Sequence, residues 1–204
     1  MAGVSSTSNT CDTDASDYIS LDGTAKGYLA SQSTTTSPAA FSLATWFRTS
    51  SARGKLIGFG SEWSTPSASQ YYDRHLYIDT SGRVVFGVRT SGTSRLCTSG
   101  TGFANGAWHQ VVATYADGVG MKLYLDGAAT PITCSTDGLI GSYAGYWRIG
   151  YDTLSSTSPD SWTGAAADSG SALGGAFKGD LDETMVWTSQ LSDSQAAAVY
   201  AFGH

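Results

Sequence analysis

Acidic side chains are the first place to look for chemistry, because they serve both as catalytic groups and as metal ligands. Hydrolysis of a glycosidic bond with retention needs two carboxyl groups about 5–5.5 Å apart. The chain has only two glutamates, Glu62 and Glu183, and they lie far apart in sequence. Asp180 and Asp182 share one face of an expected strand, but no third member of a catalytic motif follows. The sequence therefore predicts no catalytic residue, and it favours Asp182 and Glu183 as structural hydrogen-bond acceptors or partners of Arg148.

Other catalytic and zinc-binding patterns are also missing from the sequence. There is no Gly-x-Ser-x-Gly, no His-Glu-x-x-His and no phosphate-binding glycine loop. Of the three histidines, His204 is terminal and His109 lies beside Trp108 in an expected strand, where a packed, hydrogen-bonded ring is the simpler interpretation. The remaining histidine is His75. A zinc site is therefore not expected, since structural zinc needs four clustered ligands.

Calcium fits the composition better, because it prefers carboxylate and carbonyl oxygens supplied by loops. Nearly all acidic residues are aspartates, and several share one long loop or lie near the first and last strands. The predicted calcium ligands are Asp22, Asp152, Asp160, Asp168 and Asp180, with Asp73 able to approach across the rim. The alternative stays open that these aspartates form turns by bonding their own backbone.

Two long connections carry the aromatic residues that suit ligand binding. Residues 61–74 and 151–176 exceed the length of simple turns, and loops of more than about 12–15 residues in compact domains are usually functional or disordered. Sugars place apolar C–H faces on exposed aromatic rings, while charged groups fix their hydroxyls. The predicted glycan-binding residues are Trp63, Tyr71, Tyr72, Asp73, Arg74 and Trp162. Packing is the alternative for these rings. A second candidate surface is the outward face of a sheet, toward which the alternation directs Trp46, Tyr77, Arg89, Tyr124 and Arg148. Packing beneath loops is the favoured alternative there, and it applies to Trp46, Tyr124 and Trp147.

Alternating strands must position these loops. Residues 108–115 form a β-branched and aromatic run that suits a strand buried on both faces. Asp117-Gly118 then predicts a tight turn, and residues 121–125 alternate with Met121, Leu123 and Leu125 on one face. Similar alternation predicts strands in residues 41–48, 75–79, 83–89, 145–150 and 177–188, with His75, Tyr77 and Asp79 facing outward.

One helix is expected, at the C-terminal end. Ser192 and Gln195 have the spacing of a capping box, in which the side-chain oxygen of each residue accepts a hydrogen bond from the backbone N–H of the other. Ala196, Val199 and Tyr200 follow as a stripe at helical spacing, and Gly203 is a suitable stop.

The three cysteines leave one without a partner in the sequence. Cys97 and Cys134 each end an expected strand and are predicted to bridge adjacent strands, which indicates an oxidising compartment. Cys11 has no evident partner and is either free or paired upstream.

Composition and charge restrict the class of protein. Charged residues make up 14% of the chain and the net charge is −6, so nucleic acid, which requires a basic face, is excluded as a partner. No segment reaches the roughly 18–20 apolar residues of a membrane helix. The start has no signal-peptide pattern and is interpreted as a cut from a longer parent protein. We expect a flexible lead over residues 1–14 and one domain over residues 15–204.

The ordered motifs resemble a laminin G-like jelly roll of the concanavalin A-like lectin and glucanase superfamily. The resemblance runs from about residue 15 to 203 and rests on residues 41–47, 108–115, 123–127, 146–150, 177–183 and 191–192. It implies an all-β fold, a two-sheet antiparallel jelly-roll sandwich, to which the capping box adds a short C-terminal helix. It also implies frequent calcium binding and either glycan or extracellular-protein partners.

The expected function is a non-catalytic carbohydrate-binding or adhesion module of a secreted or cell-surface bacterial protein, with calcium as its candidate cofactor. The alternative is a structural or protein–protein interaction domain without a sugar site.

Overall fold

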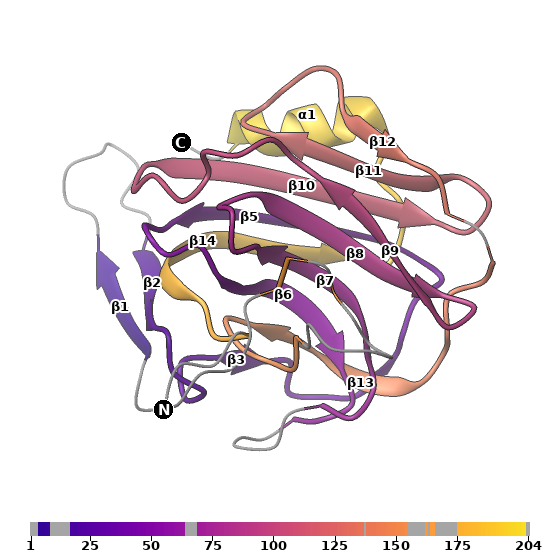
Figure 1. Ribbon diagram of the computed structural model, residues 1–204, viewed down its shortest axis with the longest axis horizontal. Helices are drawn as coiled ribbons and strands as arrows, with labels where there is room; N and C mark the ends of the chain where they lie inside the picture. Colours follow the sequence, from indigo (N-terminus) through magenta and orange to yellow (C-terminus); the bar gives the residue numbers. More distant parts are fainter. Residues whose placement is uncertain are drawn as a thin grey trace.

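Short strands pair into two antiparallel sheets that face each other (Figure 1). The structure is a computed structural model, and it describes residues 4–8, 17–63, 69–136, 138–154, 162, 164–165 and 175–202. The first sheet has the order β1 (Val4–Ser8), β2 (Asp17–Asp22), β14 (Lys178–Trp187), β5 (Ala40–Arg48), β10 (Trp108–Ala116), β11 (Gly120–Leu125) and β12 (Ile132–Cys134). The second sheet has the order β3 (Leu29–Ala30), β13 (Ala144–Ile149), β6 (Gly54–Gly60), β7 (Tyr72–Ile78), β8 (Val84–Thr90) and β9 (Thr93–Thr98), and β4 (Thr35–Thr36) also pairs with β13. This is the predicted jelly-roll sandwich.

The core lies between the sheets and follows the predicted alternation. On β5, Phe41, Leu43 and Phe47 are fully buried in it. Leu76 and Ile78 of β7 belong to the same cluster. Period-two alternation places every second side chain on one sheet face, so a single row from each strand fills the space between the sheets.

The hairpin of β10 and β11 forms as predicted. Val111 pairs with Leu125 and Tyr115 pairs with Met121, so the turn falls between Ala116 and Gly120. Gly118 in that turn has φ 74°, a left-handed conformation that favours glycine. The hairpin therefore fixes the register of the first sheet next to β5.

Helix α1 (Asp193–Phe202) covers the outer face of the first sheet (Figure 1). The capping box is confirmed: the backbone N–H of Ser192 donates to Oε1 of Gln195 at 2.9 Å, and the N–H of Gln195 donates to Oγ of Ser192 at 3.3 Å. Ala196 packs with Ala44 and Val112, and the Tyr200 ring stacks on Trp46 with centroids 5.4 Å apart. Outward-facing Trp46 is consequently buried by packing. The expected stop, Gly203, lies outside the described residues.

The outer face of the second sheet is also covered. His75 and Tyr77 face outward on β7 as predicted, and both are fully buried by packing. Trp162, Leu154 and Ala165 pack over this face. The alternation predicted the direction of the side chains correctly. Their burial depends on Leu154, Trp162 and Ala165, which are distant in sequence.

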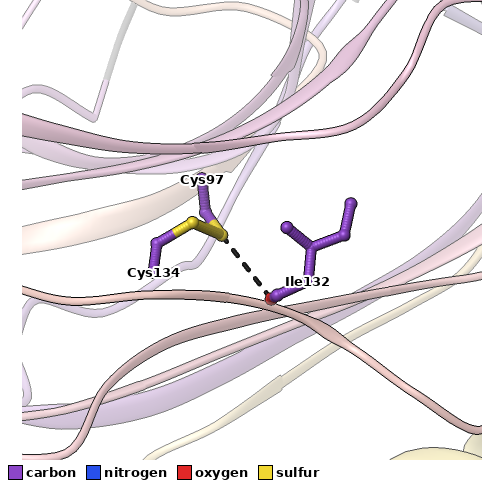
Figure 2. The surroundings of a disulfide bond; sticks show 3 residues. All are labelled: Cys97, Ile132 and Cys134. Carbon is purple, nitrogen blue, oxygen red and sulfur yellow. Dashed lines mark hydrogen bonds between the residues drawn. A yellow bond between two sulfur atoms is a disulfide. The ribbon is translucent and has the colours of Figure 1, made fainter.

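The Cys97–Cys134 disulfide is confirmed, with the Cα atoms 5.6 Å apart. Cys97 lies on β9 and Cys134 on β12, which are edge strands of different sheets. The sequence predicted a bond between adjacent strands. The bond instead joins the edge strands of the two different sheets. Sγ of Cys97 also lies 3.6 Å from the carbonyl oxygen of Ile132 (Figure 2). Cys11 lies outside the described residues.

The expected N-terminal lead contains strand β1, which pairs with β2 from Val4 opposite Leu21 to Ser8 opposite Asp17. The domain boundary near residue 15 stays a prediction. No helix in the described part of the chain has the length and apolar content needed to cross a membrane.

Candidate functional site

A cleft of about 670 Å³ opens at one end of the second sheet. It lies between the start of β7, the turn from β8 to β9 and the segment 139–143. Its walls include Tyr71, Tyr72, Asp73, Arg89, Leu139 and Tyr143. Three residues predicted to bind a glycan, Tyr71, Tyr72 and Asp73, thus line one cleft.

Backbone pairing builds the walls of this cleft. Ser91 and Gly92 have φ of 46° and 81°, the left-handed pair that a tight two-residue hairpin turn requires. The N–H of Ser91 donates to the carbonyl oxygen of Leu139 at 3.0 Å, and Thr90 forms a β-bridge with Ile140. The segment from residue 139 is therefore held against the β8–β9 turn.

Asp73 is the acidic group of the cleft. Its Oδ1 accepts hydrogen bonds from Nη1 of Arg74 and from the Tyr143 hydroxyl, the latter at 3.0 Å. A Cβ on Gly141, a residue of the cleft wall, would lie 3.6 Å from Oδ2. Burial raises the pKa of the Asp73 carboxyl, although the Arg74 charge opposes that shift. Asp73 is thus a fixed carboxylate with one oxygen on the side of the cleft wall.

Burial, together with the nearby Asp73 charge, raises the pKa of Tyr143. Its hydroxyl therefore stays protonated at neutral pH and acts as a donor. Besides Asp73, the hydroxyl lies 3.1 Å from the carbonyl oxygen of Phe59. The Tyr143 ring packs 5.9 Å from that of Tyr71, which is 61% exposed. Tyr71 is consequently a solvent-accessible ring that packs against the Tyr143 ring, whose hydroxyl is held by hydrogen bonds.

Arg74 does not reach the cleft, so its prediction as a direct ligand contact is wrong. The side chain is fully buried between the sheets, over the rings of Phe41 and Phe59 at 5.7 and 5.8 Å. Its Nη2 donates to the carbonyl oxygens of Pro38 and Gly141 at 3.0 and 2.9 Å. Arg74 therefore holds Asp73 and the cleft wall in place. The sequence predicted a loop over residues 61–74. Strand β7 instead begins at Tyr72, so it includes Tyr72, Asp73 and Arg74.

The two tryptophans of the predicted glycan set lie elsewhere. Trp63 is 53% exposed and is not part of the cleft wall. Trp162 is fully buried, with its ring 4.5 Å from that of His75, so the expectation of an exposed platform there is wrong. The Trp162 ring packs onto the outer face of the second sheet instead.

The predicted calcium ligands do not form one site in the described part of the chain. Asp22 and Asp180 lie on neighbouring strands as expected, but Asp180 accepts from Nε of Arg48 at 2.8 Å and from Oγ of Ser20 at 2.6 Å. Asp22 accepts from its own turn, as the alternative interpretation predicts. Asp152 is buried between two cations elsewhere. Among the described residues no group of three or more potential metal ligands occurs, and Asp160 and Asp168 lie outside them.

The carboxylates considered for catalysis have structural partners. Asp182 accepts from the N–H of Glu183 at 2.8 Å, which confirms its role as a structural acceptor. Glu183 has φ 44° and lies where the register of β14 shifts against β5. Arg148 pairs with Asp152 and not with Asp182 or Glu183, so that part of the expectation is wrong. The described residues give no evidence of catalysis.

Comparison with known protein families decides the relationship. A family model, Laminin_G_3, described as the concanavalin A-like lectin/glucanases superfamily, matches residues 22–197. The chain belongs to this laminin G-like family. No curated protein sequence matches this laminin G-like domain.

Solved structures share the fold of this laminin G-like domain. The native heptameric SAP-like pentraxin from Limulus polyphemus is 16% identical, with a TM-score of 0.60 over 90% of this chain and 81% of that one. The CBM40 of Ruminococcus gnavus IT-sialidase, bound to α2,3 sialyllactose, is 15% identical, with a TM-score of 0.50 over 80% of this chain and 84% of that one. Domains LG4-5 of the mouse laminin α1 chain are 15% identical, with a TM-score of 0.51 over 79% of this chain but 41% of that one. The chain thus spans less than half of that laminin structure.

Sequence reasoning missed a buried charged cluster of the laminin G-like domain, formed by Lys55, Arg148 and Asp152. All three side chains are fully buried on the outer side of the second sheet. Nζ of Lys55 and Nη1 of Arg148 each lie 3.7 Å from an oxygen of Asp152. Nζ of Lys55 also donates to the carbonyl oxygen of Thr153 at 2.7 Å, and Oδ1 of Asp152 accepts from the N–H of Ser69 at 2.9 Å. One carboxylate therefore balances two buried cations.

Burial lowers the pKa of Lys55 to about 8, against the opposing attraction of Asp152. In the unfolded chain the lysine keeps its ordinary pKa of 10.5. Between pH 8 and 10.5 the unfolded state therefore binds more protons than the folded state, and the free energy of unfolding rises with pH. We expect the free energy of unfolding to increase by about 1–2 kcal/mol from pH 7.5 to 9.5, since partial ionisation of the unfolded tyrosines near pH 9.5 offsets part of the gain from Lys55. Urea unfolding at both pH values measures this change. Lys55→Met should abolish it, and an equal rise in that variant would contradict the assignment.

Proposed function

We propose that this domain is a non-catalytic carbohydrate-binding module and that its binding site is the cleft lined by Tyr71, Asp73 and Tyr143. The observation that carries the proposal is the exposed Tyr71 ring beside the fixed Asp73 carboxylate. Aromatic rings accept the C–H faces of sugars, and carboxylates accept their hydroxyl hydrogens. The shared fold with a CBM40 in complex with sialyllactose supports the same class of ligand.

The proposal extends to the setting of the domain. The Cys97–Cys134 disulfide supports a secreted or cell-surface protein, because disulfides persist in oxidising compartments. In that setting the domain would attach a longer bacterial parent protein to a glycan. The described aspartates do not fit a calcium site, so calcium enters only as a condition of the assay.

A glycan array, probed with the folded domain in calcium and again in chelator, tests the proposal. We expect selective binding, which Tyr71→Ala weakens by about tenfold or more, as for an aromatic side chain central to an interface. Trp63→Ala is the matched control, since it removes an exposed ring outside the cleft and should leave the affinity unchanged.

Two other outcomes would redirect the proposal. Loss of binding in Trp63→Ala but not in Tyr71→Ala would place the glycan outside the cleft. Silence of the folded wild-type domain in both buffers would favour the structural or protein–protein interaction function.

A further inference from the structure

The cleft holds a second exposed apolar side chain besides Tyr71. Leu139 lines the cleft and is 71% exposed, the largest exposed fraction of any large apolar side chain in the described part of the chain. A leucine side chain has no flat face on which a sugar ring can stack, so Leu139 does not repeat the role of the Tyr71 ring. An apolar side chain that stays exposed in a ligand cleft indicates a ligand with an apolar group of its own.

Backbone pairing directs Leu139 toward the cleft. The carbonyl oxygen of Leu139 accepts from the N–H of Ser91, and the next residue, Ile140, forms a β-bridge with Thr90. The Ile140 side chain is buried in the core between the sheets. Because successive residues of an extended segment point to opposite sides, Leu139 and Gly141 lie together on the other side. Both are exposed and both line the cleft, so they form neighbouring parts of one wall.

Gly141 leaves space beside the Asp73 carboxylate. A Cβ on Gly141 would lie 3.6 Å from Oδ2 of Asp73, in ordinary van der Waals contact. The other oxygen, Oδ1, already accepts from Arg74 and Tyr143. The carbonyl oxygen of Gly141 accepts from Nη2 of Arg74 at 2.9 Å and from Oγ of Ser37 at 3.3 Å. Arg74 therefore holds both the carboxylate and the glycine beside it, and Oδ2 has a fixed place next to the cleft wall.

The spacing of these groups fits an acetamido substituent. Alternate residues of an extended segment are roughly 7 Å apart, so Leu139 lies about that far from the space that Gly141 leaves. An amide N–H donates to an oxygen about 2.9 Å away, and a methyl group contacts apolar carbons at about 4 Å. The N–H and the methyl group of an acetamido substituent are joined through one carbonyl carbon, so one such group reaches both Asp73 and Leu139. A hydroxyl in the same place reaches Asp73 alone.

We propose, on the basis of the carbohydrate-binding function above, that the cleft selects N-acetylated hexosamines. The acetamido N–H donates to Asp73, the acetamido methyl group packs on Leu139, and the sugar ring lies on Tyr71. The hydroxyl of a parent hexose can also donate to Asp73, so the preference comes from the methyl group. Burial of one such group corresponds to about fourfold in affinity.

Calorimetric titration of the folded domain with two matched pairs of sugars tests the proposal. Triacetylchitotriose and cellotriose share their linkage and differ in the substituent at C2, and N-acetylgalactosamine and galactose differ in the same way. We expect the acetylated member of at least one pair to bind, with an affinity about fourfold or more above that of its parent sugar.

The outcomes separate this proposal from the carbohydrate-binding function itself. A parent sugar that binds as tightly as its acetylated partner would overturn the preference and leave the function intact. Binding of neither pair by a domain that binds other glycans on the array would do the same. Absence of binding to any glycan would overturn both proposals.

Leu139→Ala removes the contact with the methyl group and should bring the ratio of the two affinities in a pair close to one. Val119→Ala is the matched control, because Val119 is 66% exposed in the turn between β10 and β11 and is not part of the cleft wall. The ratio should be the same in Val119→Ala as in the wild type. A ratio that stays at the wild-type value in Leu139→Ala would contradict the assigned contact.

Gly141→Ala tests the hydrogen bond to Asp73. The added methyl group would fill the space beside Oδ2 at an ordinary contact distance, so the free energy of unfolding should not change. The affinity for the acetylated sugar should decrease by about tenfold, as for a lost hydrogen bond to a charged acceptor. An unchanged affinity would place the acetamido group away from Asp73 and overturn the proposed orientation.

Discussion

Replacing Asp152 with asparagine is expected to lower the free energy of unfolding by about 3–5 kcal/mol, since removal of one partner leaves buried charge uncompensated. Asp152 alone balances Lys55 and Arg148, each 3.7 Å away, and all three side chains are fully buried. Asparagine keeps the shape and the acceptor for the Ser69 N–H but not the charge. Single domains have about 5–15 kcal/mol of stability in total, so this loss is large. Urea unfolding at neutral pH measures it.

A double variant separates lost charge from lost packing. Lys55→Met in the Asp152→Asn background removes one of the two stranded cations, so the double variant should be more stable than the sum of the single effects by at least about 1 kcal/mol. Strict additivity would show that the two side chains do not interact, and the destabilisation would then come from altered packing around Asp152.

The sheets were predictable because their pattern is local. The alternation in residues 41–48 and 121–125 reports which side chains share a face, and the structure buries Phe41, Leu43 and Met121 accordingly. The capping box of Ser192 and Gln195 likewise involves residues three apart. The disulfide was predictable as a pair, but not as a link between sheets, since that requires knowing which edge strands meet.

Coverage of the outer faces was not predictable from alternation. A period of two gives the direction of His75 and Tyr77, but it contains no information on what packs above them. Glycine within strands was the available indication, because it often marks close approach by another segment. A Cβ on Gly87 of β8 would lie 2.6 Å from the Trp162 ring, and one on Gly60 of β6 would lie 2.2 Å from Oδ2 of Asp152. Both glycines leave room for covering residues.

The candidate cleft was predicted in part. Tyr71, Tyr72 and Asp73 are consecutive in sequence, so one loop identified all three. Tyr143 and Leu139 were missed, because the bridge between Thr90 and Ile140 brings that segment to the cleft. Arg74 was assigned a ligand contact from its position beside Asp73, yet successive strand residues point to opposite faces, and Arg74 points into the core.

Truncation of Trp162 to alanine is the second substitution with a large expected effect. Its ring is fully buried, meets His75 edge-on at 4.5 Å and packs with Tyr77 and Val85 of the second sheet. A buried tryptophan replaced by alanine typically costs about 3–5 kcal/mol through lost transfer energy and the cavity left behind. We therefore expect the free energy of unfolding, measured with urea, to decrease by that amount.

Trp63→Ala is the matched control, because it removes the same side chain from a position that is 53% exposed. Its free energy of unfolding should change by no more than about 0.5 kcal/mol, as for surface substitutions without special contacts. An equally small change in Trp162→Ala would mean that burial of its ring contributes little to packing on the outer face of the second sheet. Burial of the Lys55–Asp152–Arg148 cluster would then depend on residues 151–154 alone, and the pH dependence of Lys55 would be the same in Trp162→Ala as in the wild type. If the Trp162 ring does keep water from the outer face of the second sheet, Trp162→Ala should hydrate Lys55. The increase in the free energy of unfolding between pH 7.5 and 9.5 should then be smaller in this variant than in the wild type.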